Sequence, residues 1–347
     1  MHSTANIRWL ADISLADRAM VGGKGGSLGE LKRANIEVPP GFVITTHGFE
    51  HFLAVLEKDN SIRSHVEALR DLKEISSFSA HVRARFERTP LPPDVYADIV
   101  AAHAELCGSN LNFPLAVRSS ATAEDSDNAS FAGLQETCLW VKGAEAVLKS
   151  VLTCWASLYS AASISYRRER HMPEDGIAIA IVVQKMVDAR SAGVMFTRSP
   201  LTGDRSVITV EATWGLGSAL VSGEVTPDRF VIAKITGEIS VREISDKPIQ
   251  HVPAQAGGIK LVETPEELRG VPSISDTELK ALAEVGRKVE RHYGRPQDIE
   301  WAIDRSGEIL LLQSRPETAW SGKQRSPVAK PVENPLLHVM NIFGGRR

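Results

Sequence analysis

One arginine stands at the junction between an apolar run and a long loop of small residues. Arg118 follows the apolar residues 115–117, and residues 119–137 after it are rich in Ser, Ala, Gly and Thr. Small residues let the backbone approach a polyphosphate and offer N–H donors, while the guanidinium group adds a permanent charge with a two-pronged fork. The segment therefore indicates a phosphate site with a movable cover. An ordinary surface loop is the alternative that it leaves open.

A lysine set among glycines is a second candidate for anion binding. Lys24 lies within Gly22-Gly-Lys-Gly-Gly26, just ahead of a helical pattern of apolar residues. Glycines at this place present the ammonium group to an anion near the N-terminus of a helix. The segment is not a Walker motif, because Gly25 follows the lysine where that motif has Ser or Thr. A flexible glycine turn is the alternative.

Two segments late in the chain are predicted to pair as an antiparallel hairpin. Residues 297–303 and 309–315 read as its strands, with a turn between them. Alternation of side chains puts Asp298 and Glu300 on one face of the first strand, with apolar residues on the other. We expect Asp298 to lie opposite Gln313, so that Glu300 lies diagonal to that amide.

The second strand of this hairpin brings an amide and a cation to the same surface. Alternation puts Gln313 and Arg315 on one face with Leu311. Magnesium takes one or two protein oxygens together with nucleotide phosphates, so Glu300 and Gln313 are the predicted magnesium ligands. The alternative is a solvated sheet face on which Arg315 forms an ion pair with Asp298 or Glu300.

An apolar strand leads into a short segment that could hold an adenine ring. Residues 181–183 are apolar, and Gln184, Lys185, Met186 and Val187 follow them. A crossing between two lobes can present backbone N–H and C=O groups to the edge of a purine, while apolar side chains pack on the ring. A plain linker between lobes is the alternative.

The composition is that of an ordinary globular protein. The chain has 347 residues, 43% apolar and 24% charged, with a formal net charge of -3. Without a long basic run, we expect no nucleic-acid partner and no membrane surface. Three cysteines with no CxxC pair, and no leader-like start, favour a reducing, cytoplasmic setting. The cysteines, and the ten histidines including His171, His251 and His292, are expected to be packing or surface residues.

The pattern of apolar residues predicts an α+β (α/β) fold with two lobes. Residues 1–190 are expected to form a helix-rich lobe, and residues 191–320 a β-rich lobe that contains the hairpin. Residues 321–347 form a Pro-containing tail that could be a docking segment. Helices are predicted over residues 49–57, 61–74, 77–88, 93–107, 144–170 and 276–292.

Taken together, the motifs resemble those of one family over about residues 8 to 318. It is the N-terminal ATP-grasp nucleotide-binding domain of phosphoenolpyruvate synthase, pyruvate phosphate dikinase and rifampin phosphotransferase. The motifs are Val21-Gly-Gly-Lys-Gly-Gly-Ser-Leu-Gly-Glu-Leu31, Val38-Pro-Pro-Gly-Phe42, Ala116-Val-Arg-Ser-Ser-Ala121, Phe131-Ala-Gly-Leu-Gln-Glu-Thr137, Ala192-Gly-Val-Met-Phe-Thr197, Gly215-Leu-Gly217 with Thr226-Pro-Asp228, and Asp298-Ile-Glu300 with Gln313-Ser-Arg315.

The resemblance implies an ATP-grasp fold with ATP in a cleft between the two lobes. It implies that Lys24 and Arg118 hold phosphates and that Arg315 contacts the transferring phosphates, so that these three act in catalysis by positioning and charge neutralisation. Gly133 and Thr137 would belong to the phosphate-covering loop.

The resemblance also assigns the adenine and the metal. Gln184 and the backbone of Lys185, Met186 and Val187 would hold adenine. Glu300 and Gln313 would bind Mg²⁺, and Asp298 would support the site or bind a second metal ion.

In this family ATP is split to AMP, and a histidine on a separate swivelling domain receives the phosphate and passes it to an acceptor. We see no Thr-Ser-His-type histidine segment in this sequence, so a histidine-bearing partner is expected. Ser218 departs from the family pattern, because many relatives carry Glu after Gly215-Leu-Gly217.

Three functional hypotheses follow. The end at Arg347 looks like a natural one, which favours the ATP-binding subunit of a split dikinase-type phosphotransferase. As a separate chain it resembles the nucleotide-binding subunit of phenylphosphate synthase, with phenol as the small-molecule acceptor. The second hypothesis is the ATP-binding part of a phosphoenolpyruvate synthase or rifampin phosphotransferase. The third is a non-catalytic partner that senses nucleotides.

Overall fold

A computed structural model describes residues 5–58, 61–122, 136–318 and 320. The chain divides into two compact units, residues 1–317 and 318–347, and the elements given below all belong to the first unit. The predicted tail and Gly133 lie outside the described residues.

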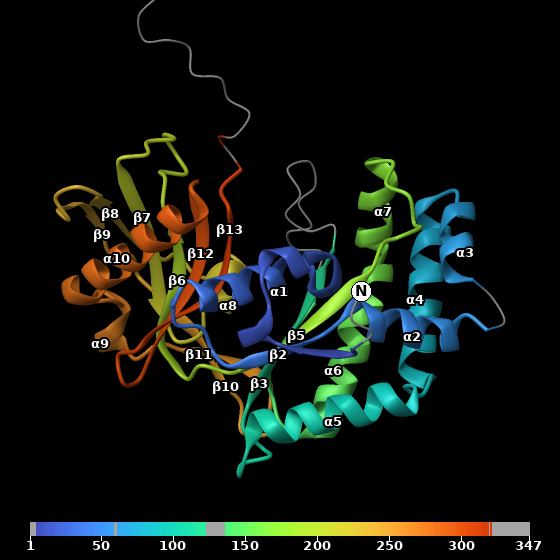
Figure 1. Ribbon diagram of the computed structural model, residues 1–347. Coiled ribbons are helices and arrows are strands. Elements are labelled where there is room, and N and C mark those ends of the chain that lie inside the picture. The colour runs from blue at the N-terminus through green and yellow to red at the C-terminus, as the bar shows by residue number, and fades with distance from the viewer. Residues whose placement is uncertain (1–4, 59–60, 123–135, 319, 321–347) are drawn as a thin grey trace, which may run out of the picture. The chain divides into compact units, whose positions relative to one another are not determined.

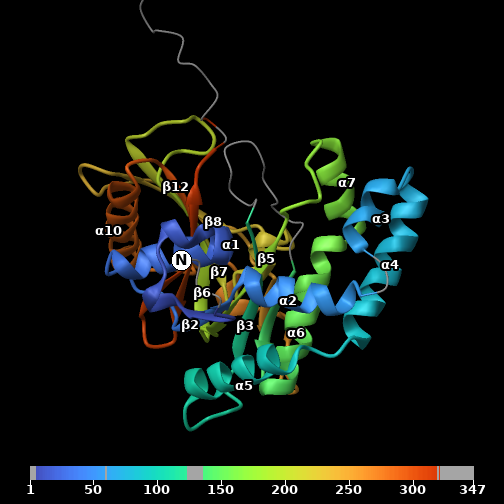
Figure 2. The ribbon, with the colours of Figure 1, turned by 45° about the vertical axis from the view of Figure 1, so that its right-hand side comes forward.

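The first lobe is built on a five-stranded sheet with the strand order β1-β2-β5-β3-β4, in which all neighbours are antiparallel. Aromatic side chains of its helices, such as Phe52, Phe86 and Trp155, form a core with the strand residues Phe42 and Val183. Figure 1 shows its helices α3, α4 and α7 on the side far from α10 of the second lobe, and Figure 2 shows α5 below the strands. Its elements are β1 Ile7–Trp9, η1 Leu10–Asp12, η2 Leu15–Asp17, α1 Arg18–Arg33, β2 Gly41–Ile44, α2 Thr46–Leu56, α3 Ile62–Ala68, α4 Leu72–Arg88, α5 Pro93–Cys107, β3 Leu115–Ala121, β4 Thr137–Val141, α6 Ala144–Ala156, η3 Ser157–Tyr159, α7 Ala161–Glu169 and β5 Ile179–Lys185.

Two predicted helix boundaries are wrong. The helix expected over residues 144–170 is broken, because α6 ends at Ala156 and α7 begins at Ala161. The break expected between residues 74 and 77 lies earlier, because α3 ends at Ala68 and α4 begins at Leu72. The side chain of Asp71 caps α4 by accepting hydrogen bonds from the backbone N–H groups of Lys73 and Glu74. An Asp in this position stabilises a new helix start, which apolar spacing alone does not reveal.

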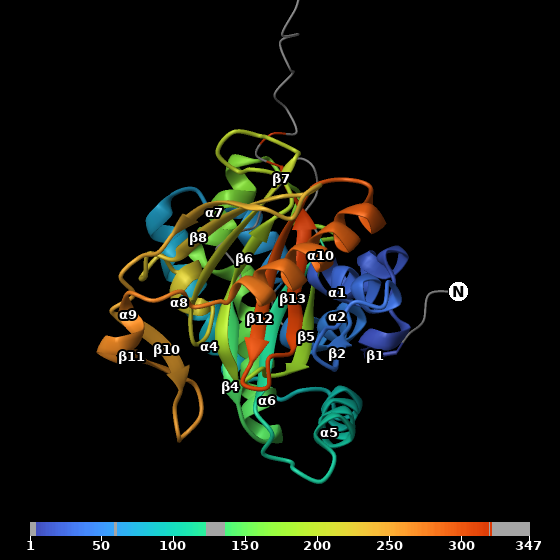
Figure 3. The ribbon, with the colours of Figure 1, turned by 90° about the vertical axis from the view of Figure 1, so that its left-hand side faces the viewer.

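The second lobe is built on a six-stranded antiparallel sheet with the order β13-β12-β6-β7-β8-β9. The long helix α10 begins with a capping box between Ser275 and Glu278 and packs its apolar face on this sheet. A separate hairpin, β10–β11, stands away from α1 and α2 in Figure 3. The elements are β6 Ala189–Phe196, β7 Val207–Trp214, α8 Ser218–Val221, β8 Asp228–Ala233, β9 Ile239–Glu243, β10 Ile249–Pro253, β11 Ile259–Glu263, α9 Glu266–Arg269, α10 Asp276–Tyr293, β12 Gln297–Asp304 and β13 Ile309–Pro316.

Helix α1 joins the cores of the two lobes. Its Val21 and Leu28 belong to one buried cluster with Val182 of the first sheet and with Met195 and Trp301 of the second. Figure 1 shows α1 between the strands of the second lobe and the helices of the first. This two-lobed α+β arrangement is the one expected of an ATP-grasp fold.

One helical stretch of the described residues, Ala144–Glu169, is long and apolar enough to cross a membrane by length and composition. Its most apolar window is 67% buried inside the lobe, as in a core helix. The stretch therefore gives no indication of a membrane protein.

Candidate functional site

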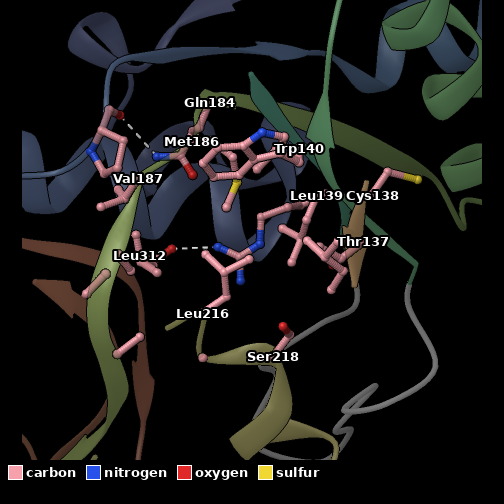
Figure 4. Close-up of a pocket in the computed structure, with 18 of the residues that line it drawn as sticks. Thr137, Cys138, Leu139, Trp140, Gln184, Met186, Val187, Leu216, Ser218 and Leu312 are labelled. Atoms are coloured by element: carbon pink, nitrogen blue, oxygen red, sulfur yellow. Dashed lines mark hydrogen bonds between the residues drawn. The ribbon is translucent and has the colours of Figure 1, made fainter. Parts of the chain in front are cut away.

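A pocket of about 880 Å³ is lined by residues of both lobes. Ten of the predicted site residues line it, whereas Asp298, expected to support the site or bind a second metal ion, is not part of the lining. The ten are Lys24, Arg118, Thr137, Gln184, Lys185, Met186, Val187, Glu300, Gln313 and Arg315. Segments that lie far apart in the sequence therefore meet around one space large enough for a nucleotide. Figure 4 shows part of this lining.

Arg118 of β3 contacts the hairpin of the other lobe through three hydrogen bonds. Its Nη1 donates to the backbone carbonyl of Leu312 at 2.7 Å. Its Nη2 donates to Oε2 of Glu300 at 2.8 Å and to Oε1 of Gln313 at 3.0 Å. The predicted phosphate-binding arginine therefore lies against both predicted magnesium ligands.

The register of the hairpin differs from the predicted one. Glu300 lies directly opposite Gln313, and Asp298 lies opposite Arg315, so the expected pairing of Asp298 with Gln313 is wrong. The register shifts after Glu300, and Leu312 is the extra residue of a β-bulge in β13. Direct pairing brings the two predicted ligand oxygens closer than the diagonal arrangement would.

The bulge also exchanges the faces of β13. Leu311 is 1% exposed in the core behind the sheet, whereas Leu312 and Gln313 both line the pocket. The prediction that Leu311 shares a face with Gln313 and Arg315 is therefore wrong, because strict alternation fails where one extra residue enters the strand. The periodicity of the sequence gives no indication that the strand contains an extra residue.

Asp298 holds Arg315 in place. Its Oδ2 accepts from Nε of Arg315 at 2.9 Å, and Nη2 of the same guanidinium lies 2.8 Å away. Burial raises the pKa of Asp298, although Arg315 acts in the opposite direction. Burial likewise raises the pKa of the neighbouring Glu211. The ion-pair alternative thus describes Asp298, whereas Glu300 pairs with Arg118.

Lys24 enters the pocket from a distorted turn within α1. Gly22 has φ 72° and ψ 179°, a conformation open almost only to glycine, and helical geometry resumes after it. The hydroxyl of Ser120 accepts from the N–H of Gly25 at 3.1 Å and donates to the carbonyl of Val21 at 2.9 Å. This fixes the lysine loop on β3 near Arg118, and Lys24 is buried against the pocket.

The predicted adenine segment follows β5. The side-chain amide of Gln184 donates to the carbonyl of Pro39 at 3.1 Å, which orients it at the pocket wall. The ammonium group of Lys185 lies 4.9 Å from the ring centre of Phe113, so Lys185 turns its charge onto an aromatic face. The N–H groups of Lys185 and Met186 donate to the backbone carbonyls of Pro40 and Pro114, both at 2.9 Å, so a purine edge would have to meet other backbone groups of this segment.

An apolar cluster forms the wall beside this segment. It includes Trp140, Val187 and Leu216, with Met186 and Leu312 packed against it. Figure 4 shows Trp140 near Met186, with Leu216 across the pocket from both. Flat apolar surfaces of this kind suit an adenine ring.

Sequence reasoning missed Trp140. Its backbone has φ 59° at an irregular point of β4, where the pairing with β3 shifts between Leu115 and Val117. Its carbonyl accepts from the N–H of Gly258 at 3.1 Å, which ties the β10–β11 turn to the first lobe. An aromatic residue three positions after Thr137 was the available signal, but its direction depends on the distorted backbone.

Two further polar groups at the pocket also escaped prediction. Cys138 lines the pocket, and a hydrogen bond with Cys154 lowers the pKa of its thiol to about 7. His251, expected to be a packing or surface residue, lies 2.8 Å from the hydroxyl of Ser218 at the pocket wall. Both contacts join residues of different elements, so spacing in the sequence does not reveal them.

Comparison with protein families gives one match over most of the chain. Residues 18–335 match the family described as pyruvate phosphate dikinase, AMP/ATP-binding domain. Every described residue that lines the pocket lies within the matched region.

Two relatives show how much of a longer protein the chain represents. A phosphoenolpyruvate synthase of Aeropyrum pernix is 42% identical over 361 residues, which cover 94% of this chain and 44% of that protein. A rifampicin phosphotransferase of Streptomyces is 40% identical over 312 residues, which cover 89% of this chain and 35% of that protein. The chain thus spans less than half the length of these relatives.

Similarity to solved structures is distant. A D-alanyl-alanine synthetase of Vibrio cholerae aligns over 87% of this chain and 56% of its own, with 9% sequence identity and a TM-score of 0.33.

Proposed function

Because the chain belongs to the family of pyruvate phosphate dikinase AMP/ATP-binding domains, we propose that it binds ATP with Mg²⁺ and supplies the ATP-splitting half of a dikinase-type phosphotransferase. One observation carries the proposal: ten predicted nucleotide and metal residues, from Lys24 to Arg315, line a single pocket. The apolar wall at one end of the pocket suits the base of a nucleotide, and the cationic side chains and oxygens at the other end suit its phosphates and a metal ion.

The donor set fits magnesium. A carboxylate oxygen of Glu300 and an amide oxygen of Gln313 converge on one nitrogen of Arg118, at 2.8 and 3.0 Å. Two convergent protein oxygens leave room for phosphate and water ligands, which magnesium retains. When bound, the ion would neutralise phosphate charge and help align the transferring group.

The protein side chains supply positioning and charge. Lys24 and Arg118 would hold the phosphates, and Arg315, anchored by Asp298, would stabilise charge on the transferring group. Trp140 and Val187 would pack on the base and keep the nucleotide in one orientation. This arrangement lowers the barrier by orientation and electrostatics and requires no general base of its own.

The acceptor of the phosphate is proposed to be a histidine outside this pocket. No histidine of the described residues lines it. A histidine-bearing phosphotransfer domain or partner subunit would receive the group and pass it to a small molecule. The names of the relatives favour pyruvate or a rifamycin as that molecule. Phenol, the acceptor of phenylphosphate synthase, is the further candidate that the sequence resemblance raises.

The test follows the nucleotide product and the label. The purified chain is incubated with Mg²⁺ and β-labelled ATP, with and without a separately produced histidine domain of a family member. AMP with acid-labile label on the added domain is expected, and Arg118→Ala should abolish both. Absence of AMP when the histidine domain is present, or full activity in Arg118→Ala, would refute the proposal. Adding pyruvate, a rifamycin or phenol to the labelled domain then identifies the acceptor by which compound removes the label.

A further inference from the structure

A serine at the wall of the nucleotide pocket is the first member of a hydrogen-bonded relay. The hydroxyl of Ser218 lies 2.8 Å from Nδ1 of His251, and Nε2 of His251 lies 3.3 Å from Oε2 of Glu224. The other oxygen of this carboxylate, Oε1, accepts from the hydroxyl of Ser222 at 2.6 Å. Hydroxyl, imidazole and carboxylate therefore follow one another in the order found in activated serine nucleophiles.

The direction of the relay follows from its last member. A hydrogen bond from Ser222, together with the nearby His251, lowers the pKa of Glu224, which keeps this group a carboxylate that only accepts. Nε2 of His251 therefore carries the proton that faces Glu224. In the neutral ring, Nδ1 is then the acceptor for the Ser218 hydroxyl, so His251 is placed to remove the proton of that hydroxyl.

The backbone around the relay fixes its geometry. The carbonyl of His251 accepts from the N–H of Leu216 at 3.0 Å. Gly215 has φ 70°, and a Cβ there would lie 2.5 Å from the same carbonyl, so the close approach requires glycine. The N–H of Glu224 donates to the carbonyl of Ala219 at 3.0 Å and closes the turn after α8. These three backbone contacts hold the relay residues in place.

Ser218 lies away from the adenine wall. Figure 4 shows it at the opposite end of the pocket from Gln184 and Met186, with its hydroxyl directed toward the pocket. The preceding residue, Gly217, lies close to Ala192 of β6. Along that strand, Ala192 is two residues from the residue that pairs with Glu300. Ser150 also lines the pocket, but its hydroxyl is hydrogen-bonded to Cys138 instead of to an imidazole.

We propose that Ser218 is a phosphoryl acceptor, which this chain modifies with its own bound ATP. The inference rests on the proposed ATP site. As the bond forms between Oγ of Ser218 and the γ-phosphorus, the bond from that phosphorus to the bridging β,γ-oxygen breaks and ADP leaves. The proton of the hydroxyl passes to Nδ1 of His251, and Glu224 stabilises the resulting imidazolium. No other reactant is required. The product is a phosphoserine at the pocket wall, a second fate for ATP beside transfer to a histidine.

The experiment uses the full chain, Mg²⁺ and ATP labelled at either the γ- or the β-position, without any added histidine domain. Label from γ-labelled ATP is expected to resist acid, to be removed by alkali, and to map to the Ser218 peptide and not to the Ser150 peptide. ADP should appear in equal amount. Ser218→Ala should lose the label, whereas Ser218→Thr should regain it as phosphothreonine.

Substitutions of the other two relay residues distinguish a role in catalysis from a purely structural role. His251→Asn should slow labelling about 100-fold or more, the usual effect of losing a general base. Glu224→Gln should also slow it, because the amide no longer stabilises the imidazolium of His251, while the labelled residue stays the same. Labelling of both variants at the wild-type rate would overturn the relay.

Other outcomes separate this inference from the proposed function. A chain that binds ATP, by fluorescence titration, but gains no acid-stable label overturns the role of Ser218 and leaves the ATP site standing. Label at another residue, label that persists in Ser218→Ala, or label from the β-position overturns it as well. A chain that binds no ATP would overturn both.

Discussion

Arg118 and Glu300 are 182 positions apart in the sequence, and their side chains join the two sheets at 2.8 Å. The pair lies where the predicted phosphate and metal sites meet, because the guanidinium group of Arg118 contacts both predicted metal ligands, Glu300 and Gln313. Side-chain exposures of 11% and 28% mean that water screens the pair only in part.

Replacing Arg118 by lysine should weaken binding of Mg-ATP. Lysine keeps the charge, but it cannot reproduce the fork that reaches Glu300, Gln313 and the Leu312 carbonyl together. Lysine also cannot present two parallel N–H groups to a phosphate, and loss of one charged hydrogen bond to the nucleotide, about 1.5–3 kcal/mol, predicts a Kd about 10- to 100-fold higher by calorimetry. Arg305→Lys, which alters an exposed pair with Asp188, is the matched control. Equal affinities for the two variants would contradict the role of Arg118.

The direct pairing of Glu300 with Gln313 predicts that the two can be exchanged. Glu300→Gln alone removes the carboxylate, and it should raise the magnesium concentration needed for half-maximal ATP binding about 10-fold or more. Adding Gln313→Glu restores one carboxylate and one amide across the same pair of strands. We expect the double variant to recover part of the loss. Magnesium titrations at fixed ATP measure this, and a double variant weaker than Glu300→Gln would show that the two oxygens are not equivalent.

Gly22→Ala should destabilise the chain. A Cβ on Gly22 would lie 2.1 Å from the carbonyl oxygen of Ser120, and φ 72° with ψ 179° adds backbone strain. We expect a loss of at least about 3 kcal/mol in the free energy of unfolding. Gly176→Ala is the control, because Gly176 has φ 78° but no atom within 4 Å of its Cβ position. It should lose about 1 kcal/mol. Denaturant titrations of both variants decide whether close approach or φ alone constrains this turn.

Cys138 should react with alkylating agents at neutral pH. A hydrogen bond with Cys154 lowers its thiol pKa to about 7, so the reactive thiolate increases as the pH rises through 7. The alkylation rate, followed by mass spectrometry of peptides, should reach half its plateau near pH 7. Burial raises the pKa of Cys107, which serves as an internal control and should stay unreacted over this range. Cys154→Ala removes the hydrogen bond and should move the midpoint for Cys138 upward; an unchanged midpoint would refute this cause.

The sequence predicts the candidate ligands better than their geometry. Charged and amide groups such as Lys24, Arg118 and Gln313 stand at the ends of apolar or glycine-rich segments, and this local pattern marks them. The opposition of Glu300 to Gln313 depends on a one-residue bulge that side-chain alternation does not encode. The contact between Ser218 and His251 depends on how β10 meets the turn after β7, a non-local event with no local pattern.

Trp140 is a second residue whose place in the site the sequence does not predict, in this case because of its backbone conformation. The sequence gives no sign of its role, because a φ of 59° is rare for a bulky side chain and is imposed by the tertiary structure. Helices were easier, since α10 combines strict apolar spacing with a capping box. Where local sequence preferences and tertiary packing favour the same structure, the periodicity of apolar residues was sufficient to predict the element.

The extra residue Leu312 has a consequence for protein engineering. The turn at residues 305–308 should accept insertions or deletions, since surface turns tolerate changes in length. Removal of one residue within β13 would instead exchange which side chains face the core and which face the nucleotide. A designer who grafts the oxygen pair onto another hairpin must therefore transplant the irregular strand as a unit. Copying Glu300 and Gln313 alone onto a regular hairpin would change which strand residues face the guanidinium group.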